Sequence, residues 1–394
     1  MKSFHQNQFK RFFASFLLSV SLIVSSFAQD WRSVHDGLEY AEVTRTIDNQ
    51  TVRMNLLRLD LKKVRLDVVH AMDAAIGTEK ASSIATRHGA VAAINAGFFR
   101  LDNSIWAGDS AGILMIDSKI LSEAQSERVA LLIDNAPLPC SELCVPENRT
   151  NVSFDHLKTW NTVIVGKTHL EALGINRQRM ENDLVVFTPE FGRTTLTDNT
   201  GIEVVVRREK VVEIVTDRGS NHIPADGFIL SGTGTNKKEL AEIKAGAKVA
   251  YRPDNYVDVP TADGKGKYRS FRPAEDIVAG VPQLIKDSKI DVTWQEEKTT
   301  KSFVETRHPR TAVAKLKDGK FLMITVDGRS ESSGGISLYD LAAYLLELGA
   351  TDAMNLDGGG STTMFLDGKV VNHPSDKEGE RKVSDAILVT LRKK

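Results

Sequence analysis

A hairpin pattern that occurs four times along the chain does most to limit its fold. Each copy consists of an apolar run, Asp-Ser-Lys or Asp-Gly-Lys, and a second apolar run, at residues 114–121, 284–291, 314–324 and 364–371. Aspartate followed by Ser or Gly suits the tight turn of a β-hairpin. Together with alternating apolar stretches such as residues 51–61, the pattern predicts an α+β fold with a large, mostly antiparallel β-sheet core and a few packed helices.

Two segments have the pattern of helices that pack on this sheet. In residues 78–89, Ile84 and Ala85 share one face, with Thr78 as the expected N-cap and Gly89 as the stop.

Residues 337–349 predict the second helix, with Ser337 as N-cap, Asp340 in the capping-box position and Gly349 as stop. One face carries leucines at helical spacing and is expected to be core: Leu338, Leu341, Leu345 and Leu348. The apolar run TDAMNL that follows is expected to be a buried strand, and this helix-to-strand unit to add a parallel pair to the sheet.

The N-terminus is typical of an exported bacterial protein. Basic residues precede the apolar run 12–24, which ends in Ser-Phe-Ala, so residues 1–28 are expected to be a cleaved signal peptide that leaves no membrane span. The mature protein would then be periplasmic or extracellular. We expect residues 29–80 to be a strand-rich segment of the same domain as residues 81–394, with a polar insertion or long loop near 137–161.

Composition narrows the classes of partner. The chain has 51 basic and 52 acidic side chains, so its overall field is weak and a nucleic-acid or polybasic membrane surface is not expected. An anionic ligand would have to be held locally. The two cysteines, Cys140 and Cys144, are either a disulfide of an exported protein or two free thiols.

A turn with three glycines, in NLDGGGSTTM, follows the strand after the second helix. Asp357 stands where this strand ends, and behind it come Gly358, Gly359, Gly360, Ser361 and Thr362. Glycines let a ligand approach backbone amides, and the hydroxyls add donors, so the turn suits a phosphate or a sugar hydroxyl. The alternative is a sharp bend that only redirects the chain.

A second acid-and-donor pattern lies in RHPRTAVA and FLMITVDGRS. The apolar strand at 321–326 ends in Asp327, followed by Gly328 and Arg329, and Arg310 precedes the strand before it. Arg310 and Arg329 are candidates to grip a phosphoryl group, because guanidinium groups bind it with fixed, bidentate donors. A salt bridge to either aspartate is the alternative.

Two further stretches offer polar groups. VAAINAGFF is expected to be a buried strand that ends at Asn95, Ala96 and Gly97, with Phe98 or Phe99 as a wall of a sugar pocket or as core. TPEFGRTT adds Glu190 as another carboxylate.

These stretches, with GVPQLIKDSK, NHPSD and ERKVSDAI, resemble one family, the phosphodiester glycosidases. The resemblance covers most of the chain from about residue 81, and its most specific part is the motif from Gly334 to Met364. It implies cleavage between the anomeric carbon and the phosphate oxygen of a glycosyl phosphodiester, which releases a sugar and a phosphomonoester. The implied partner is a phosphorylated or phosphodiester-linked glycan.

The resemblance also implies that one cleft gathers the candidate residues. In our hypothesis the phosphate is bound by Arg310, Arg329 and the 358–362 turn, with Asn95 and Gly97 also facing the substrate. Asp357 or Asp327 would be the acid or nucleophile, and Glu190 a weaker candidate for the second carboxylate. No cofactor is required by any motif. Carboxylates at strand ends leave a calcium ion open, although the sequence has no calcium-loop motif.

Two rival functions remain open. GDSAG, residues 108–112, matches the nucleophile elbow of serine hydrolases with Ser110 as nucleophile, but an elbow needs a helix after it and a hairpin is expected there. A non-catalytic module that binds phosphorylated glycans would use the same cleft without needing carboxylates at the anomeric carbon.

Overall fold

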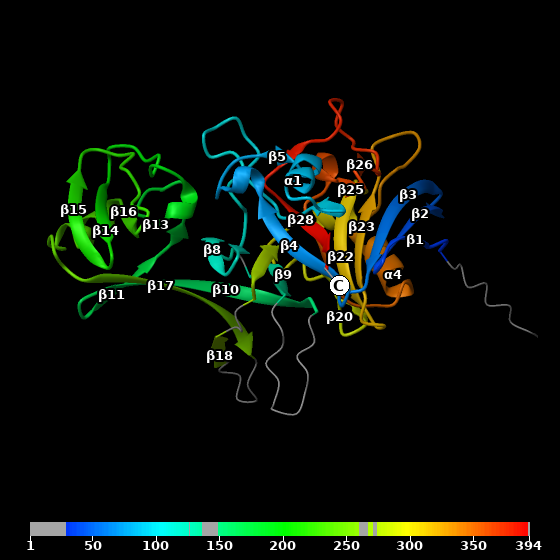
Figure 1. The fold of residues 1–394 in the computed structure, drawn as a ribbon, viewed down its shortest axis with the longest axis horizontal. Helices are drawn as coiled ribbons and strands as arrows, with labels where there is room; N and C mark the ends of the chain where they lie inside the picture. The colour runs from blue at the N-terminus through cyan, green and yellow to red at the C-terminus, as the bar shows by residue number, and fades with distance from the viewer. Residues whose placement is uncertain (1–28, 126, 136–148, 260–266, 271–273, 393–394) are drawn as a thin grey trace, which may run out of the picture.

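The computed structural model describes residues 29–125, 127–135, 149–259, 267–270 and 274–392 (Figure 1). The expected signal peptide and both cysteines lie outside these residues. Among the described helices, none combines the length and the apolar character that a membrane-spanning segment requires. The prediction of an α+β fold with mostly antiparallel sheets is confirmed.

The central layer is an eight-stranded sheet in the order β1-β2-β3-β23-β22-β24-β20-β21, here called the central sheet. Its strands are β1 Arg32–His35, β2 Leu38–Ile47, β3 Gln50–Leu59, β20 Gln283–Lys286, β21 Lys289–Ile290, β22 Arg310–Leu316, β23 Phe321–Val326 and β24 Ala350–Asn355. All of its neighbouring strands pair antiparallel.

The expected parallel pair is therefore wrong. β24 pairs antiparallel with both β22 and β20. The reason is the place of β22: β23 and β24 run in the same direction, as a connection through a helix allows, but β22 lies between them and is antiparallel to both.

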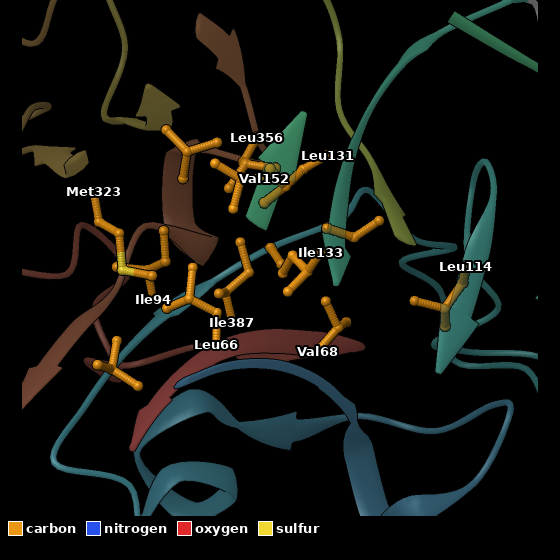
Figure 2. Close-up of a cluster of buried hydrophobic side chains, with 14 of the residues drawn as sticks. Leu66, Val68, Ile94, Leu114, Leu131, Ile133, Val152, Met323, Leu356 and Ile387 are labelled. Carbon is orange, nitrogen blue, oxygen red and sulfur yellow. The ribbon is translucent and has the colours of Figure 1, made fainter. Parts of the chain in front are cut away.

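A five-stranded sheet, here called the second sheet, packs face to face with the central one. Its order is β26-β25-β6-β28-β4. The strands are β4 Val64–His70, β6 Ala92–Asn95, β25 Met364–Leu366, β26 Lys369–Val370 and β28 Asp385–Leu391. The main core fills the space between the two sheets, with Met323 and Leu356 from the central side and Ile94 and Ile387 from the second sheet (Figure 2).

Helices cover the outer faces of this sandwich. α4 (Leu338–Glu347) and the short α3 (Lys301–Glu305) share a core with the central sheet, and α1 (Ala81–Arg87) packs on the second sheet. The layers are therefore helix, sheet, sheet and helix. As predicted, Leu338, Leu341 and Leu345 are buried, and Leu348 packs against the same core while half-buried.

The helix ends match the sequence signals in part. The Ser337 hydroxyl caps α4 by accepting the Asp340 amide at 3.1 Å. Gly349 and Gly89 follow their helices with positive φ, at +88° and +65°. Thr78 is not the cap of α1, because β5 (Glu79–Lys80) pairs with β27 (Lys382–Val383) and delays the helix to residue 81.

A third sheet extends from this sandwich. Its strands are β7 Leu114–Ile116, β8 Lys119–Ser122, β9 Val129–Asp134, β10 Asn151–Val165, β11 Thr168–Ala172, β17 Val249–Val259, β18 Lys267–Ser270 and β19 Asp276–Ala279. The loop expected near 137–161 is wrong from Asn151 onward. There the chain is β10, and the alternation of buried Val152 and Phe154 with exposed Ser153 explains why it is a strand.

β10 and β17 lead to a separate lobe, green in Figure 1, that the sequence patterns did not indicate. It contains a sheet in the order β12-β13-β16-β14-β15 and the helix α2. Its elements are β12 Gly174–Ile175, β13 Leu184–Phe187, β14 Ile202–Arg207, β15 Lys210–Thr216, β16 Gly227–Gly232 and α2 Gly234–Ala241. Phe191 of this lobe contacts Trp106 of the main body, with ring centroids 5.7 Å apart.

All four expected hairpins are present, as β7–β8, β20–β21, β22–β23 and β25–β26. In three of them the two turn residues both have positive φ, for example Asp117 at 50° and Ser118 at 62°. This is the turn geometry that fits the twist of paired strands.

The shared core of α4 and the central sheet gives a stability prediction. Leu341→Ala should lower the free energy of unfolding by roughly 2–5 kcal/mol, because the side chain is fully buried and its removal leaves a cavity. Urea unfolding would measure the change. The matched control is Leu173→Ala, whose side chain is 54% exposed and whose loss should change stability little. Equal effects of the two substitutions would contradict the packing described here.

Candidate active site

Asn95 holds together the sheet edge at which the candidate residues meet. Its amide nitrogen donates to the backbone oxygen of Asp357 at 2.7 Å. Its side-chain oxygen accepts from the Thr311 hydroxyl at 2.7 Å and from the Thr363 amide at 3.1 Å. Asn95 is fully buried and all of these bonds are to the protein itself, so its side chain fixes the backbone near residues 357 and 363 and does not face a ligand directly.

The backbone of Gly97 is also fixed by a buried side chain. Its amide donates at 2.5 Å to the carboxylate of Asp385, a buried residue that also accepts from the Ser384 hydroxyl at 2.7 Å. The neighbouring carbonyl of Ala96 accepts the Asp357 amide at 2.9 Å. The segment after β6 thus fixes the backbone position of Asp357.

Asp357 is the candidate carboxylate with the most perturbed acidity. Burial raises the pKa of Asp357 to about 6, and the negative charge of Asp385 acts in the same direction. The Ser361 hydroxyl, the Gly358 amide and the positive charge of Arg381 act against this rise. Such a carboxyl changes protonation near neutral pH, as groups in acid–base catalysis do.

Most backbone amides of the glycine turn are hydrogen-bonded within the protein, which the sequence did not suggest. The amides of Gly358, Gly359, Ser361 and Thr362 donate to Asp357 Oδ1, Pro309 O, Gly358 O and Gly359 O. The Ser361 and Thr362 side chains are buried. These four amides are therefore bonded within the protein, whereas the buried Ser361 and Thr362 hydroxyls have no hydrogen-bond partner in the described residues. That the turn binds phosphate stays a prediction.

Missing Cβ atoms in this turn make room for cationic side chains. A Cβ on Gly359 would lie 3.1 Å from Nη2 of Arg329, and φ there is +61°. A Cβ on Gly360 would lie 2.1 Å from Nη2 of Arg381, which is ion-paired with Asp376 at 2.7 Å. The glycines are needed because guanidinium groups pack directly on the turn.

Arg310, Arg329 and His308 form a group of cationic or ionisable side chains, here called the basic cluster. Arg310 is 2% exposed, and within the described residues it donates to the backbone oxygens of Ile336, Phe303 and Thr306 and to no carboxylate. Arg329 Nη2 lies 3.4 Å from His308 Nδ1. No described carboxylate is ion-paired with either arginine.

The ionisation of the basic cluster reflects this lack of negative charge. Burial, with the nearby charge of Arg329, lowers the pKa of Arg310 to about 10. Burial and both guanidinium groups lower the pKa of His308. The predicted alternative, a salt bridge from Arg310 or Arg329 to one of the aspartates, is not formed. An anion bound here would offset the repulsion between the cations.

Asp327 is held at the same edge of the sheet. It is 6% exposed, and one carboxylate oxygen accepts from the His373 amide at 3.0 Å and the Asn372 amide group at 3.5 Å. Asn372 also donates to the Thr362 carbonyl at 3.0 Å, which links Asp327 to the glycine turn. Burial raises the pKa of Asp327.

Glu190 is not brought together with these residues. It follows β13 at the lobe side, forms an ion pair with Lys119 at 2.9 Å, and lines a separate cavity of about 450 Å³ with Asp276 and His70. Burial acts to raise the pKa of Glu190, but hydrogen bonds from Lys119, Thr188 and the backbone, together with the Lys119 charge, lower it overall. A second carboxylate for Asp357 is therefore better sought in Asp327.

Three residues of the site were not identified from the sequence: His308, Arg381 and Asp385. His308 and Arg310 alternate in RHPRT, so an extended chain places them on the same side. Arg381 and Asp385 stand in ERKVSDAI, a stretch that already carried the family resemblance. Their distance from residue 357 in the sequence hid their spatial relation to Asp357.

Two other possibilities raised by the sequence are a serine nucleophile and a bound divalent ion. The Ser110 hydroxyl is buried and has no hydrogen-bond partner in the described residues, and the strand β7 follows it where an elbow requires a helix. No group of three or more His, Cys, Asp or Glu side chains suited to a metal ion occurs in the part of the chain that the structure describes.

Comparison with known proteins agrees with the resemblance. Residues 200–390 match the model of the phosphodiester glycosidase family. A prophage-derived protein, YomE of Bacillus subtilis, is 40% identical over 107 residues, which are 27% of this chain and 16% of that protein. The human N-acetylglucosamine-1-phosphodiester alpha-N-acetylglucosaminidase is 33% identical over 113 residues, 26% of this chain and 22% of the relative.

The fold also has a solved counterpart. A hypothetical protein from Synechocystis has a TM-score of 0.75 to this structure at 22% sequence identity, over 92% of this chain and 63% of that one. The two sequence matches, to YomE and to the human enzyme, span only about a fifth of the length of those proteins. Residues 200–390 of this chain thus match a phosphodiester glycosidase domain, which supports the resemblance to that family.

Proposed function

We propose that this protein hydrolyses glycosyl phosphodiesters between the anomeric carbon and the phosphate oxygen, with release of a sugar and a phosphomonoester. The observation that carries the proposal is the basic cluster: a buried arginine and an adjacent second arginine without a carboxylate partner in the described residues. A phosphodiester anion supplies the missing negative charge. Two aspartates with raised pKa stand at the same sheet edge and supply the carboxylates of a glycosidase.

The leaving group decides what the carboxylates must do. Breaking the bond from the anomeric carbon to oxygen leaves both electrons on the phosphate, as a phosphomonoester whose second pKa is about 6. Such a group leaves at neutral pH with little help from an acid, provided its developing charge is stabilised. Arg310 and Arg329 would do this, because cationic donors placed beside the phosphate stabilise charge that develops in the transition state.

Asp357 would then act in its ionised form. A carboxylate at the anomeric carbon either attacks it directly or removes a proton from the attacking water, and both roles need the proton to be absent. Asp327 is the second carboxylate in this scheme. Water provides the hydroxyl of the released sugar, and its remaining proton passes to solvent or to the phosphomonoester.

The proposal is tested first by sugar release from UDP-sugars and methylphospho-sugars. We expect the wild-type protein to release sugar and Asp357→Asn to be at least 100-fold slower, as for loss of an essential catalytic group. Asp217→Asn, at a position 83% exposed, is the matched control and should keep full activity. Circular dichroism checks folding, and a parallel series with a chelator tests dependence on a divalent ion.

Two results would contradict this scheme in different ways. Full activity of Asp357→Asn would remove Asp357 from the chemistry. A folded wild-type protein that binds the phosphorylated glycans but cleaves none would favour the rival function, a non-catalytic binding module.

Phosphate binding gives an independent prediction. Arg329→Gln and Arg310→Gln should each weaken binding of inorganic phosphate by roughly 10-fold to 100-fold, the value of one or two charge-assisted hydrogen bonds. Titration calorimetry would measure it. Arg45→Gln is the control, because its guanidinium is ion-paired with Glu347 at 2.8 Å. Arg329 is the safer variant, since its side chain is exposed. Unchanged binding in both site variants would exclude the basic cluster as the phosphate site.

The pH dependence of kcat/KM tests the protonation state of Asp357. We expect activity to rise as the pH increases through about 6, because the ionised carboxylate is the active form. Asp385→Asn removes a negative charge that raises this pKa, so the rise should move to lower pH. Arg381→Gln removes a positive charge that lowers it, so the rise should move to higher pH. A fall in activity through pH 6 would assign Asp357 the role of the acid instead.

A further inference from the structure

Phe98 and Phe303 form an aromatic pair beside the basic cluster. Their ring centroids lie 6.1 Å apart with the planes at 63°, an edge-to-face contact. Phe303 also packs on Arg310, whose guanidinium carbon lies 5.0 Å from the ring centroid, and on the core shared by α4 and the central sheet. Arg310 also donates to the Phe303 carbonyl at 2.7 Å. The aromatic pair is thereby tied to the buried cation of the candidate phosphate site.

The structure separates Phe98 from its neighbour Phe99. Phe99 packs against the core formed by α1 and the second sheet. Phe98 is half-buried and belongs to none of the hydrophobic core clusters of the described residues. Core packing therefore accounts for Phe99, whereas the printed contact of Phe98 is the edge-to-face one with Phe303.

Phe98 belongs to a segment whose backbone is hydrogen-bonded in place and which also holds Asp357. The Ala96 carbonyl accepts the Asp357 amide at 2.9 Å, and the Gly97 amide is bound by Asp385 at 2.5 Å. The Phe98 carbonyl accepts the Ala111 amide at 2.8 Å. Three consecutive residues are thus hydrogen-bonded in place, and Phe98 follows two residues after the one that anchors Asp357.

We propose that Phe98, supported by Phe303, is the wall on which the apolar face of the substrate's sugar ring packs. This inference rests on the proposed function and adds the sugar subsite to it. A glycosyl phosphodiester has its sugar at the carboxylate and its phosphate at the cations. Phe98 lies two residues after Ala96, whose carbonyl accepts the Asp357 amide, and Phe303 packs on Arg310, so the aromatic pair connects the segment that holds Asp357 with the buried cation. Aromatic walls with a few fixed polar groups are the usual construction of small-ligand sites.

The test compares ligands with and without the sugar. Binding of inorganic phosphate and of glucose, galactose and N-acetylglucosamine 1-phosphates is measured by calorimetry, and the tightest sugar phosphate is kept. Phe98→Ala should weaken binding of that sugar phosphate by roughly fivefold to tenfold, the effect of one aromatic contact, and leave phosphate binding unchanged. Phe98→Tyr keeps the ring and should bind like the wild type.

Phe99→Leu is the matched control, expected to lower the melting temperature without changing the preference for sugar phosphate over phosphate. Equal weakening of both ligands in Phe98→Ala, or no weakening of either, would overturn the sugar wall while leaving the proposed function intact. A wild-type protein that binds sugar phosphate no better than phosphate would do the same. A wild-type protein that binds neither ligand would count against the proposed function itself.

Discussion

The whole site depends on one buried side chain that ties two sheets together at their shared edge. Asn95, at the end of a strand in the second sheet, bonds to Thr311 of the central sheet and to the backbone at residues 357 and 363. A buried amide that loses these partners is costly, so the bonds fix the spacing between the sheets there. The packed core sets the general layering, and this junction sets where the carboxylate of Asp357 lies.

An electrostatically unfavourable group, the buried guanidinium of Arg310, lies at the same sheet edge. A buried guanidinium without a carboxylate partner costs free energy that a protein selected only for stability would remove with an acid or an apolar residue. Here Arg310 donates to backbone oxygens, packs on the Phe303 ring and, among the described residues, pairs with no carboxylate. The same arrangement would suit the proposed anion, because donors that are already in place need not reorganise when it binds.

Local sequence patterns predicted what local forces determine. The hairpins, the capped helix at Ser337 and the strands ending at Asp327 and Asp357 all follow from turn chemistry and periodicity. The lobe after β10, the place of β22 between two strands of like direction, and the grouping of Asp385 with Asp357 depend on pairing between distant segments. The surroundings of the glycine turn were not predicted for a related reason, since the side chains that pack on Gly359 and Gly360, Arg329 and Arg381, come from elsewhere in the chain.

The way the chain enters and leaves the lobe has a consequence for how such proteins can vary. Val165 at the end of β10 and Val249 at the start of β17 are directly paired, so the 83 residues between them occupy the position of a hairpin turn. The pairing register of β10 and β17 does not depend on how many residues lie between Val165 and Val249. The lobe is therefore a module that can be lengthened, shortened or exchanged while the sandwich of the central and second sheets keeps its geometry.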